Sequence, residues 1–402
     1  MVLHKKILHT FSRFLPKGDK YVVIEVLNHY VQVTVLRTDL GNKQIRILKA
    51  FSKDLPQPDP HLALKELRRL LRKIPRLSQY RIVVGLDSLL ATTKYASISL
   101  VRPNAKEVID EADLDNLISQ AIWRFFDKHR FRIAQKMGID EVDVLLTDVR
   151  IRDIRIDGHR VVNPIGFKAK SVEVFFSQTF VSRGFMAELR EAVPREQIEL
   201  LVEAGTALSH VLAQAHDGGA FYMANLFPSH TAVFAAAHPH FGHEDSFAWG
   251  GDNLVRYVSR SLHVDPETAV AVIRAYAESE GSEQFLKKFE GVVTHELGSF
   301  ANGVESLVDR DVPDVYLNPF FPIPEVVFSS RFQNRFDRPL RLLPLSTQFV
   351  TEKLGYTVQY NKAASGLRDP LMLYGVLLEL ALLPRNDTMS HLADRRVRWL
   401  VT

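Results

Sequence analysis

Two similar stretches of alternating apolar residues constrain this chain more than any other feature. Residues 21–36 contain two runs rich in β-branched side chains that meet at a Leu-Asn-His-Tyr corner, a pattern typical of a tight β-hairpin. About two hundred residues later, residues 221–236 repeat the pattern around a polar corner that holds Asn225, Ser229 and His230. The repeat predicts two related domains that face each other.

The composition indicates a folded protein larger than one ordinary domain. With 402 residues, of which 46% are hydrophobic and 24% charged, the chain is long enough for two or more domains and is not expected to be disordered. The net charge of +4 is small for this length, so no nucleic-acid partner is expected. Because the chain has no cysteine, disulfides, thiolate metal sites and cysteine nucleophiles are excluded.

Both ends of the chain are basic and partly apolar. No apolar run reaches the roughly 18 residues that cross a bilayer, and the first segment lacks an uninterrupted signal-peptide core, so a cytoplasmic protein is expected. Residues 1–19 place apolar side chains at helical spacing around Lys5 and Arg13, and residues 385–402 place Trp399 among arginines. Each segment either packs on the folded body or contacts the inner face of an anionic membrane.

The predicted elements divide the chain into six parts. These are a basic amphipathic segment, 1–19; a first domain, 20–80, completed by 179–218 and 368–384; an inserted α+β unit, 81–178; a second domain, 219–272, completed by 314–367; a helical unit, 273–313; and a tail, 385–402. Helices are predicted at 104–130 and 180–192. The polar residues around 238–245 are expected to join two strands.

The order of these parts and several short motifs resemble the FtsA/PilM-like branch of the actin-like ATPase superfamily. The matching motifs are Ile154-Arg-Ile-Asp-Gly158, Asn163-Pro-Ile-Gly-Phe-Lys-Ala-Lys-Ser-Val-Glu-Val174, Trp249-Gly-Gly-Asp252, Pro266-Glu-Thr-Ala269 and Asp369-Pro370. The resemblance covers most of residues 20–384. It implies an α/β fold of the actin-like, ribonuclease H-like type, with two domains and an inserted α+β strand-helix-strand subdomain.

The resemblance also identifies the positions where active relatives bind ATP and Mg²⁺. Glycines there let backbone N–H groups approach phosphate oxygens, and aspartates hold the hydrated metal ion. The vestigial cleft would comprise Glu25, Asn28, Asn225, Thr231, Gly250, Gly251, Asp252 and Asn318. Leu27, Phe227, Pro228 and Pro319 are expected to fill or stiffen the space of a triphosphate, and proline removes an N–H donor. No bound cofactor and no catalytic residue are therefore expected.

Structural roles compete with functional ones at several of these positions. Glu25 is also consistent with a solvated corner, Asp252 with an acid in the first turn of a helix, and Gly250-Gly251 with a plain strand-to-helix turn. The histidines and acids between His238 and Asp245 are of types that bind zinc, but their spacing matches no known zinc pattern, so no metal site is expected.

The resemblance implies a non-hydrolysing adaptor or scaffold of the cell-division FtsA or type IV pilus PilM type. In that interpretation the inserted subdomain, residues 81–178, binds a division or pilus component at the inner membrane, and the chain can also associate with itself. Two alternatives are an active ATPase or phosphotransferase with divergent phosphate motifs and a structural metal protein built on the histidine turn.

Overall fold

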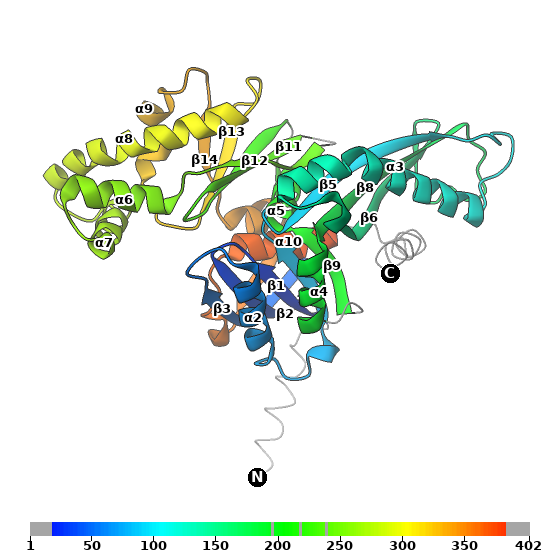
Figure 1. Cartoon of the computed structure of the whole chain (residues 1–402), viewed down its shortest axis with the longest axis horizontal. Helices are drawn as coiled ribbons and strands as arrows, with labels where there is room; N and C mark the ends of the chain where they lie inside the picture. Colours follow the sequence, from blue (N-terminus) through cyan, green and yellow to red (C-terminus); the bar gives the residue numbers. More distant parts are fainter. Residues whose placement is uncertain (1–17, 194–196, 217–218, 238–239, 383–402) are drawn as a thin grey trace, which may run out of the picture.

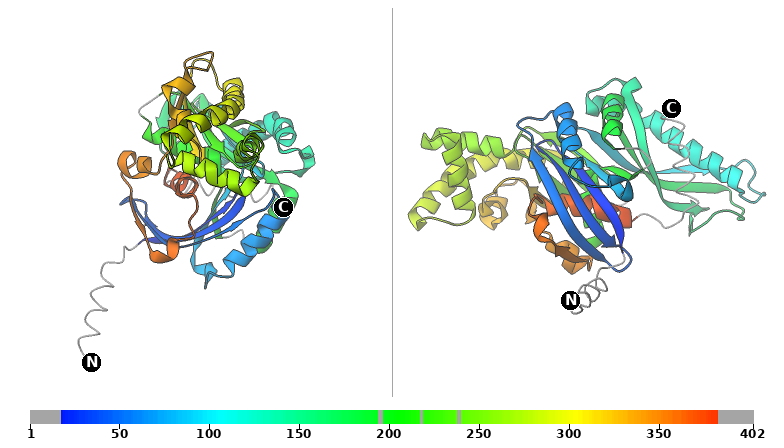
Figure 2. Two further views of the ribbon diagram at one scale, coloured as in Figure 1. Left: turned by 90° about the vertical axis from the view of Figure 1, so that its left-hand side faces the viewer. Right: turned by 90° about the horizontal axis from the view of Figure 1, so that it is seen from below.

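The computed structural model describes residues 18–193, 197–216, 219–237 and 240–382. The predictions made for the amphipathic segment, the C-terminal tail and His238 therefore lie almost entirely outside the described residues. Within them, the two predicted domains lie next to each other, and the inserted subdomain and a group of helices project to opposite sides (Figures 1 and 2). No helix in these ranges is long and apolar enough to cross a membrane.

The first domain is built on a six-stranded sheet with the order β15-β3-β2-β1-β4-β9. Its strands are β1 (Asp19–Val26), β2 (Tyr30–Asp39), β3 (Gln44–Asp54), β4 (Arg81–Leu86), β9 (Ile198–Glu203) and β15 (Thr357–Tyr360). The predicted hairpin is confirmed, because β1 pairs antiparallel with β2 and places Glu25 opposite Gln32. Helices α2 (Pro60–Leu71) and α4 (Arg183–Ala192) cover one face of this sheet with leucine-rich stripes.

The second domain repeats the same plan. Its sheet has the order β12-β11-β10-β13-β14 and consists of β10 (Phe221–Leu226), β11 (Thr231–Ala237), β12 (His240–Phe247), β13 (Asp314–Pro319) and β14 (Arg341–Pro344). In both sheets a hairpin is flanked by the third strand on one side and by a parallel fourth and fifth strand on the other. This repetition confirms the predicted α/β fold of two related domains.

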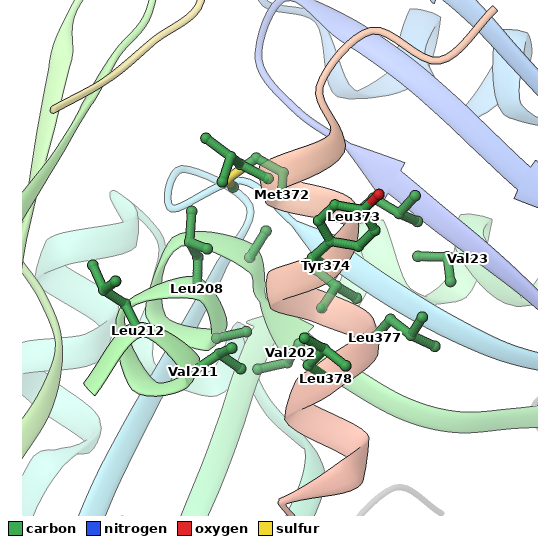
Figure 3. Close-up of a cluster of buried hydrophobic side chains, with 14 of the residues drawn as sticks. Val23, Val202, Leu208, Val211, Leu212, Met372, Leu373, Tyr374, Leu377 and Leu378 are labelled. Carbon is green, nitrogen blue, oxygen red and sulfur yellow. The ribbon is translucent and has the colours of Figure 1, made fainter. Parts of the chain in front are cut away.

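Two helices fill the space between the sheets. They are α5 (Ala204–Ala215) and α10 (Pro370–Ala381), which pack against each other over a close approach at Gly375, where a Cβ would lie 2.7 Å from that of Leu208 (Figure 3). Every residue of α10 from Leu371 to Glu379 is buried. A helix that is apolar all round is typical of a central core position, and the cluster around α10 includes apolar residues of both sheets.

The inserted subdomain is a four-stranded antiparallel sheet with one long helix on one face. It contains β5 (Ala91–Val101), β8 (Ser171–Ser182), β6 (Val144–Ile156) and β7 (His159–Val161), with α3 (Glu111–Met137). The predicted boundary at residue 81 is wrong, because β4 belongs to the first domain's sheet and the insert begins after it. The helix predicted from residue 104 begins only at Glu111, after its cap Asp110, and Arg102 holds the preceding loop through Glu107 and Ala169.

The remaining helices extend from the second domain. They are α6 (Gly251–Leu262), α7 (Pro266–Ala277), α8 (Glu283–Leu307) and the short α9 (Ser330–Gln333). Three further predictions need correction. The segment 240–247 is itself strand β12, β8 continues to Ser182, whose side chain caps α4, and β15 joins the first sheet by pairing with β3 rather than completing the second domain.

Candidate functional site

The two hairpin corners meet at the centre of the molecule. Each closes with the same backbone hydrogen bond, from Leu27 N to Tyr30 O (3.0 Å) and from Phe227 N to His230 O (2.9 Å). Across the interface, Asn28 Nδ2 lies 3.5 Å from His230 Nδ1. The first and second domains therefore contact each other directly at the position where the resemblance places a phosphate group.

Aromatic rings fill this junction. The ring of Phe227 stacks on Phe320 at a centroid distance of 4.6 Å and on His230 at 4.8 Å, and His29 contacts Phe227 at 5.3 Å. Tyr30 completes the group through an edge contact with His29. We call these five residues the aromatic plug. Phe227 is only 2% exposed, and burial, with Arg368 and His230 nearby, lowers the pKa of His29 to about 3, so that ring is neutral.

The N-terminus of α6 is occupied by the second corner. Gly251 N donates to Phe227 O at 3.2 Å and Asp252 N to Pro228 O at 2.8 Å. The first free N–H groups of a helix are the donors that usually bind a phosphate, and here two of them bond to backbone oxygens. Gly250 permits this approach, because a Cβ on that residue would lie 2.2 Å from Phe227 O.

Several predicted polar residues lie buried beneath the plug. Glu25 is fully buried and accepts a hydrogen bond from Gln32 Nε2 at 2.6 Å. Asn225 and Asn318 lie side by side in the β10–β13 register, where Asn318 Nδ2 donates to Asn225 Oδ1 at 3.1 Å. Thr231 Oγ1 donates to the backbone oxygen of Trp249 at 2.8 Å. Of these residues, Asn225 and Asn318 bond to each other, whereas Glu25 and Thr231 bond to residues outside the predicted set and Asp252 is exposed at the start of α6.

Desolvation raises the pKa of two carboxyl groups in this region. Burial raises the pKa of Glu25 well above its usual value. Asp369, the cap of α10, is half-buried, and desolvation raises its pKa to about 6 although Leu371 N donates to it. A protonated carboxyl is a poor ligand for Mg²⁺, which prefers charged oxygens. Among the described residues, no group of three or more histidines and carboxylates is arranged to hold a metal ion.

Sequence reasoning missed other residues at this junction. Asp87 follows β4 and is 2% exposed; its Oδ2 accepts from Asn28 N and its Oδ1 from Leu89 N, both at 3.0 Å. Its position was recognisable, since an acid at the carboxyl end of a parallel strand faces the crevice of an open α/β sheet. His29 and Phe320 gave no such signal, because their contact joins segments almost three hundred residues apart.

A groove of about 310 Å³ lies where the insert meets the body. Its lining includes Tyr95, Arg152, Arg155 and Phe175 from the insert and His210 and Phe241 from the body. The guanidinium of Arg155 lies 4.5 Å from the centre of the Phe175 ring. Phe175 and Arg155 alternate along their strands with core residues, so they point to the face of the insert's sheet opposite α3.

A buried charge network closes one side of this groove. Glu379 of α10 is fully buried and bonds to Arg152 and Tyr95 through one carboxylate oxygen, and its other oxygen lies 2.7 Å from His210 Nδ1. Burial alone would raise the pKa of Glu379, but Arg152 and His210 outweigh it and lower the pKa to about 2. The charged carboxylate therefore ties the insert to the central helix.

Comparisons with known proteins give similarity at the level of shape. No family model and no curated protein matches the sequence. Similar solved structures include a PilM–PilN type IV pilus biogenesis complex, with 13% identity, 90% of this chain and 97% of that chain covered and a TM-score of 0.44. They also include the ethanolamine utilization protein EutJ from Carboxydothermus hydrogenoformans, with 12% identity, 92% and 91% covered and a TM-score of 0.37.

The cytoplasmic domain of EpsL, an inner-membrane component of the type II secretion system of Vibrio cholerae, is another such structure. It has 10% identity, 84% of this chain and 94% of that chain covered and a TM-score of 0.32. At these scores the strand order decides the fold, and both sheets follow the order of the ribonuclease H-like domain. The fold is actin-like. The actin-like fold by itself does not determine an activity.

Proposed function

We propose that this chain is a non-hydrolysing actin-like adaptor that holds a protein partner at the inner face of the membrane. The observation that carries the proposal is the aromatic plug. Phe227 and Phe320 stack where the two corners meet, and the α6 donors bond to the corner's own backbone. A triphosphate placed there would have to displace stacked rings, of which Phe227 is buried and Phe320 half-buried, and compete with existing hydrogen bonds. Protein contacts, rather than a nucleotide, then hold the two domains together.

Titration calorimetry with Mg-ATP tests the nucleotide half of this proposal. We expect no saturable binding tighter than about 100 μM, which corresponds to roughly −5.5 kcal/mol, and no release of phosphate. Tighter binding would favour the alternative function, an active ATPase or phosphotransferase with divergent motifs. The full chain should be used, because the corners come from both domains.

We place the partner's binding segment in the groove between the insert and the body. The groove combines aromatic side chains with Arg155 and Arg160, which lie 3.6 and 2.8 Å from the carboxylate of Asp153. Two guanidinium groups thus share one acid and leave one net positive charge, while Arg152 is neutralised by Glu379. Such a lining suits an extended segment with an apolar anchor and an acidic neighbour. A cell-division or pilus-assembly component of the inner membrane that exposes such a segment fits this description. Self-association of the chain is compatible with the same role.

Site-specific crosslinking in the native host tests the groove. Phe175 is replaced by the photo-reactive p-benzoyl-phenylalanine, and Leu262, which is 38% exposed on α6, carries the same group as a matched control. We expect one adduct with a membrane protein from position 175 and none from position 262. The yield of this adduct should fall strongly when Arg155→Glu is added. Identical adducts from both positions, or none from position 175, would refute the assignment of the groove.

A further inference from the structure

The outer face of α3 carries exposed aromatic side chains. Eight of the eleven large hydrophobic residues that are well exposed among the described residues lie between Leu89 and Phe167. Two of them, Trp123 (46% exposed) and Phe131 (63% exposed), are on α3. Single exposed apolar residues are ordinary, but a tryptophan and a phenylalanine two turns apart on one helix form an unusual surface.

The same half of α3 is strongly basic. Between residues 123 and 136 it has five lysines or arginines and one acid, Asp127, which equals the net charge of +4 of the whole chain. Arg130 and Lys136 bond to backbone oxygens of neighbouring segments. The other three cations are exposed and pair with no carboxylate within the described ranges; they are Arg124, Lys128 and Arg132.

A second observation supports a positive potential at this surface. The pKa of His129 is lowered by burial and further by Lys128, Arg132 and Lys94. These cations are therefore close enough to His129 to lower its pKa, and they face a single acid, Asp127, within residues 123–136. An anionic partner would be attracted to it.

We infer that this face of α3, defined by Trp123, Arg124, Lys128, Phe131 and Arg132, binds the surface of an anionic membrane. Tryptophan and phenylalanine enter the boundary between headgroups and acyl chains, and arginine and lysine bind the phosphates around them. The rings stand on a convex helix rather than on a sheet or in a groove, the arrangements that stack nucleic-acid bases. The charges and the apolar side chains together therefore favour lipid over nucleic acid.

The position of α3 fits the adaptor role. The helix covers one face of the insert's sheet, and the groove with Phe175 opens on the other face. A membrane bound by α3 would thus lie beside the groove without covering it. The inference concerns a membrane contact within the folded body and is separate from the contacts predicted for the two ends of the chain.

A fluorescent label tests this inference, because a chain without cysteine can be labelled at one chosen residue. Gln135→Cys, on the exposed face of α3, and Val270→Cys, on α7, each carry an environment-sensitive nitrobenzoxadiazole label on the full chain. We expect anionic phosphatidylglycerol vesicles to shift the emission to the blue at position 135 only. Neutral phosphatidylcholine vesicles should have little effect.

The charges are tested by a triple variant of α3, Arg124→Gln, Lys128→Gln and Arg132→Gln. The control of equal charge is Lys65→Gln on α2 with Arg72→Gln and Lys73→Gln, which directly follow that helix. Each lost cation weakens binding about fivefold, so the α3 variant should lose on the order of 100-fold in vesicle affinity, and the control should lose much less. Equal losses, or vesicle binding without a change at position 135, would overturn the inference. A response of the label to duplex DNA but not to vesicles would replace lipid by nucleic acid.

The results of the labelling experiment and of the charge variants do not depend on the crosslinking experiment at Phe175. The exposed positions chosen here leave the core unchanged, and circular dichroism should show unaltered thermal unfolding of every variant.

Discussion

The buried pair of Arg152 and Glu379 gives the sharpest test of how the insert is attached. Arg152 comes from β6 of the insert and is 12% exposed, and Glu379 lies in the last turn of α10 and is not exposed at all. Glu379→Leu leaves a buried guanidinium without its carboxylate, and Arg152→Met leaves a buried carboxylate without its guanidinium. Removing one partner of a buried pair typically costs about 3–5 kcal/mol.

The double variant Arg152→Met, Glu379→Leu should be more stable than either single variant. Replacing a whole buried ion pair by apolar side chains of similar volume is often neutral, because the cost of removing both charges from water disappears with them. The free energies of unfolding, measured by urea titration followed by circular dichroism, should therefore not be additive: the double variant should lose far less than the about 6–10 kcal/mol that the two single costs would give if they added.

The pH dependence gives an independent estimate of the same interaction. The pKa of Glu379 falls from its usual 4.5 to about 2, because Arg152 and His210 outweigh the effect of burial. A lowered carboxyl pKa stabilises the folded state above pH 4.5, and that stability is lost as the pH falls from 4.5 towards 2. The difference corresponds to about 3 kcal/mol, in agreement with the cost of breaking the pair.

The acid-induced loss should be smaller in the double variant, which lacks the titrating carboxylate. Two results would refute the reasoning: single substitutions whose effects simply add, or an unchanged loss of stability between pH 4.5 and 2 in the double variant. Either would mean that the pair does not hold the insert on α10.

Three further outcomes follow from the packing. Gly250→Ala should destabilise the protein by more than about 2 kcal/mol in the urea assay, because its Cβ would lie 2.2 Å from a backbone oxygen. As a control, Gly298→Ala in α8, which has open space around it, should stabilise the protein by about 0.5–1 kcal/mol. Burial lowers the pKa of Lys136 to about 8, so its protonated form opposes folding. Lys136→Met should therefore raise the free energy of unfolding at pH 7, and this gain should shrink as the pH rises from 8 to 10.5. Phe227→Ala should cost about 3–5 kcal/mol and still not permit Mg-ATP binding tighter than about 100 μM in calorimetry, because the α6 donors stay bonded to the corner.

The sequence predicted the parts of the fold that depend on local pattern. The two hairpins follow from dense β-branched and aromatic runs, and both form in the structure. The strand β9 was missed, because a short apolar run such as Ile198–Glu203 does not distinguish a buried strand from a helical turn. β15 has only four residues, and its pairing with β3 comes from tertiary contacts.

The candidate site shows the same division. Glu25 and Asn225 were predicted from the resemblance, which identifies the hairpin corners as the phosphate-binding positions of active relatives, and both are fully buried. The composition of the plug was not predictable beyond Phe227, since Tyr30 and Phe320 meet only when two domains fold together. The groove depends on Glu379, which in the sequence is one acid within an otherwise apolar helix, and a single acid there gives no indication of its partner.

That single acid links the two halves of the proposed function. In a nucleotide-dependent actin-like protein, the bound phosphate can change the relative orientation of the two domains. Here stacked rings and backbone hydrogen bonds occupy the place where the two hairpin corners meet. A ligand shifts an equilibrium only by its differential affinity for two states, so a fixed corner leaves little for a nucleotide to change. The charge network at Glu379 lines the groove and also contacts α10, which packs between both domains. A partner that binds in the groove would therefore act on α10 and the core directly, and this coupling does not need a nucleotide in the cleft.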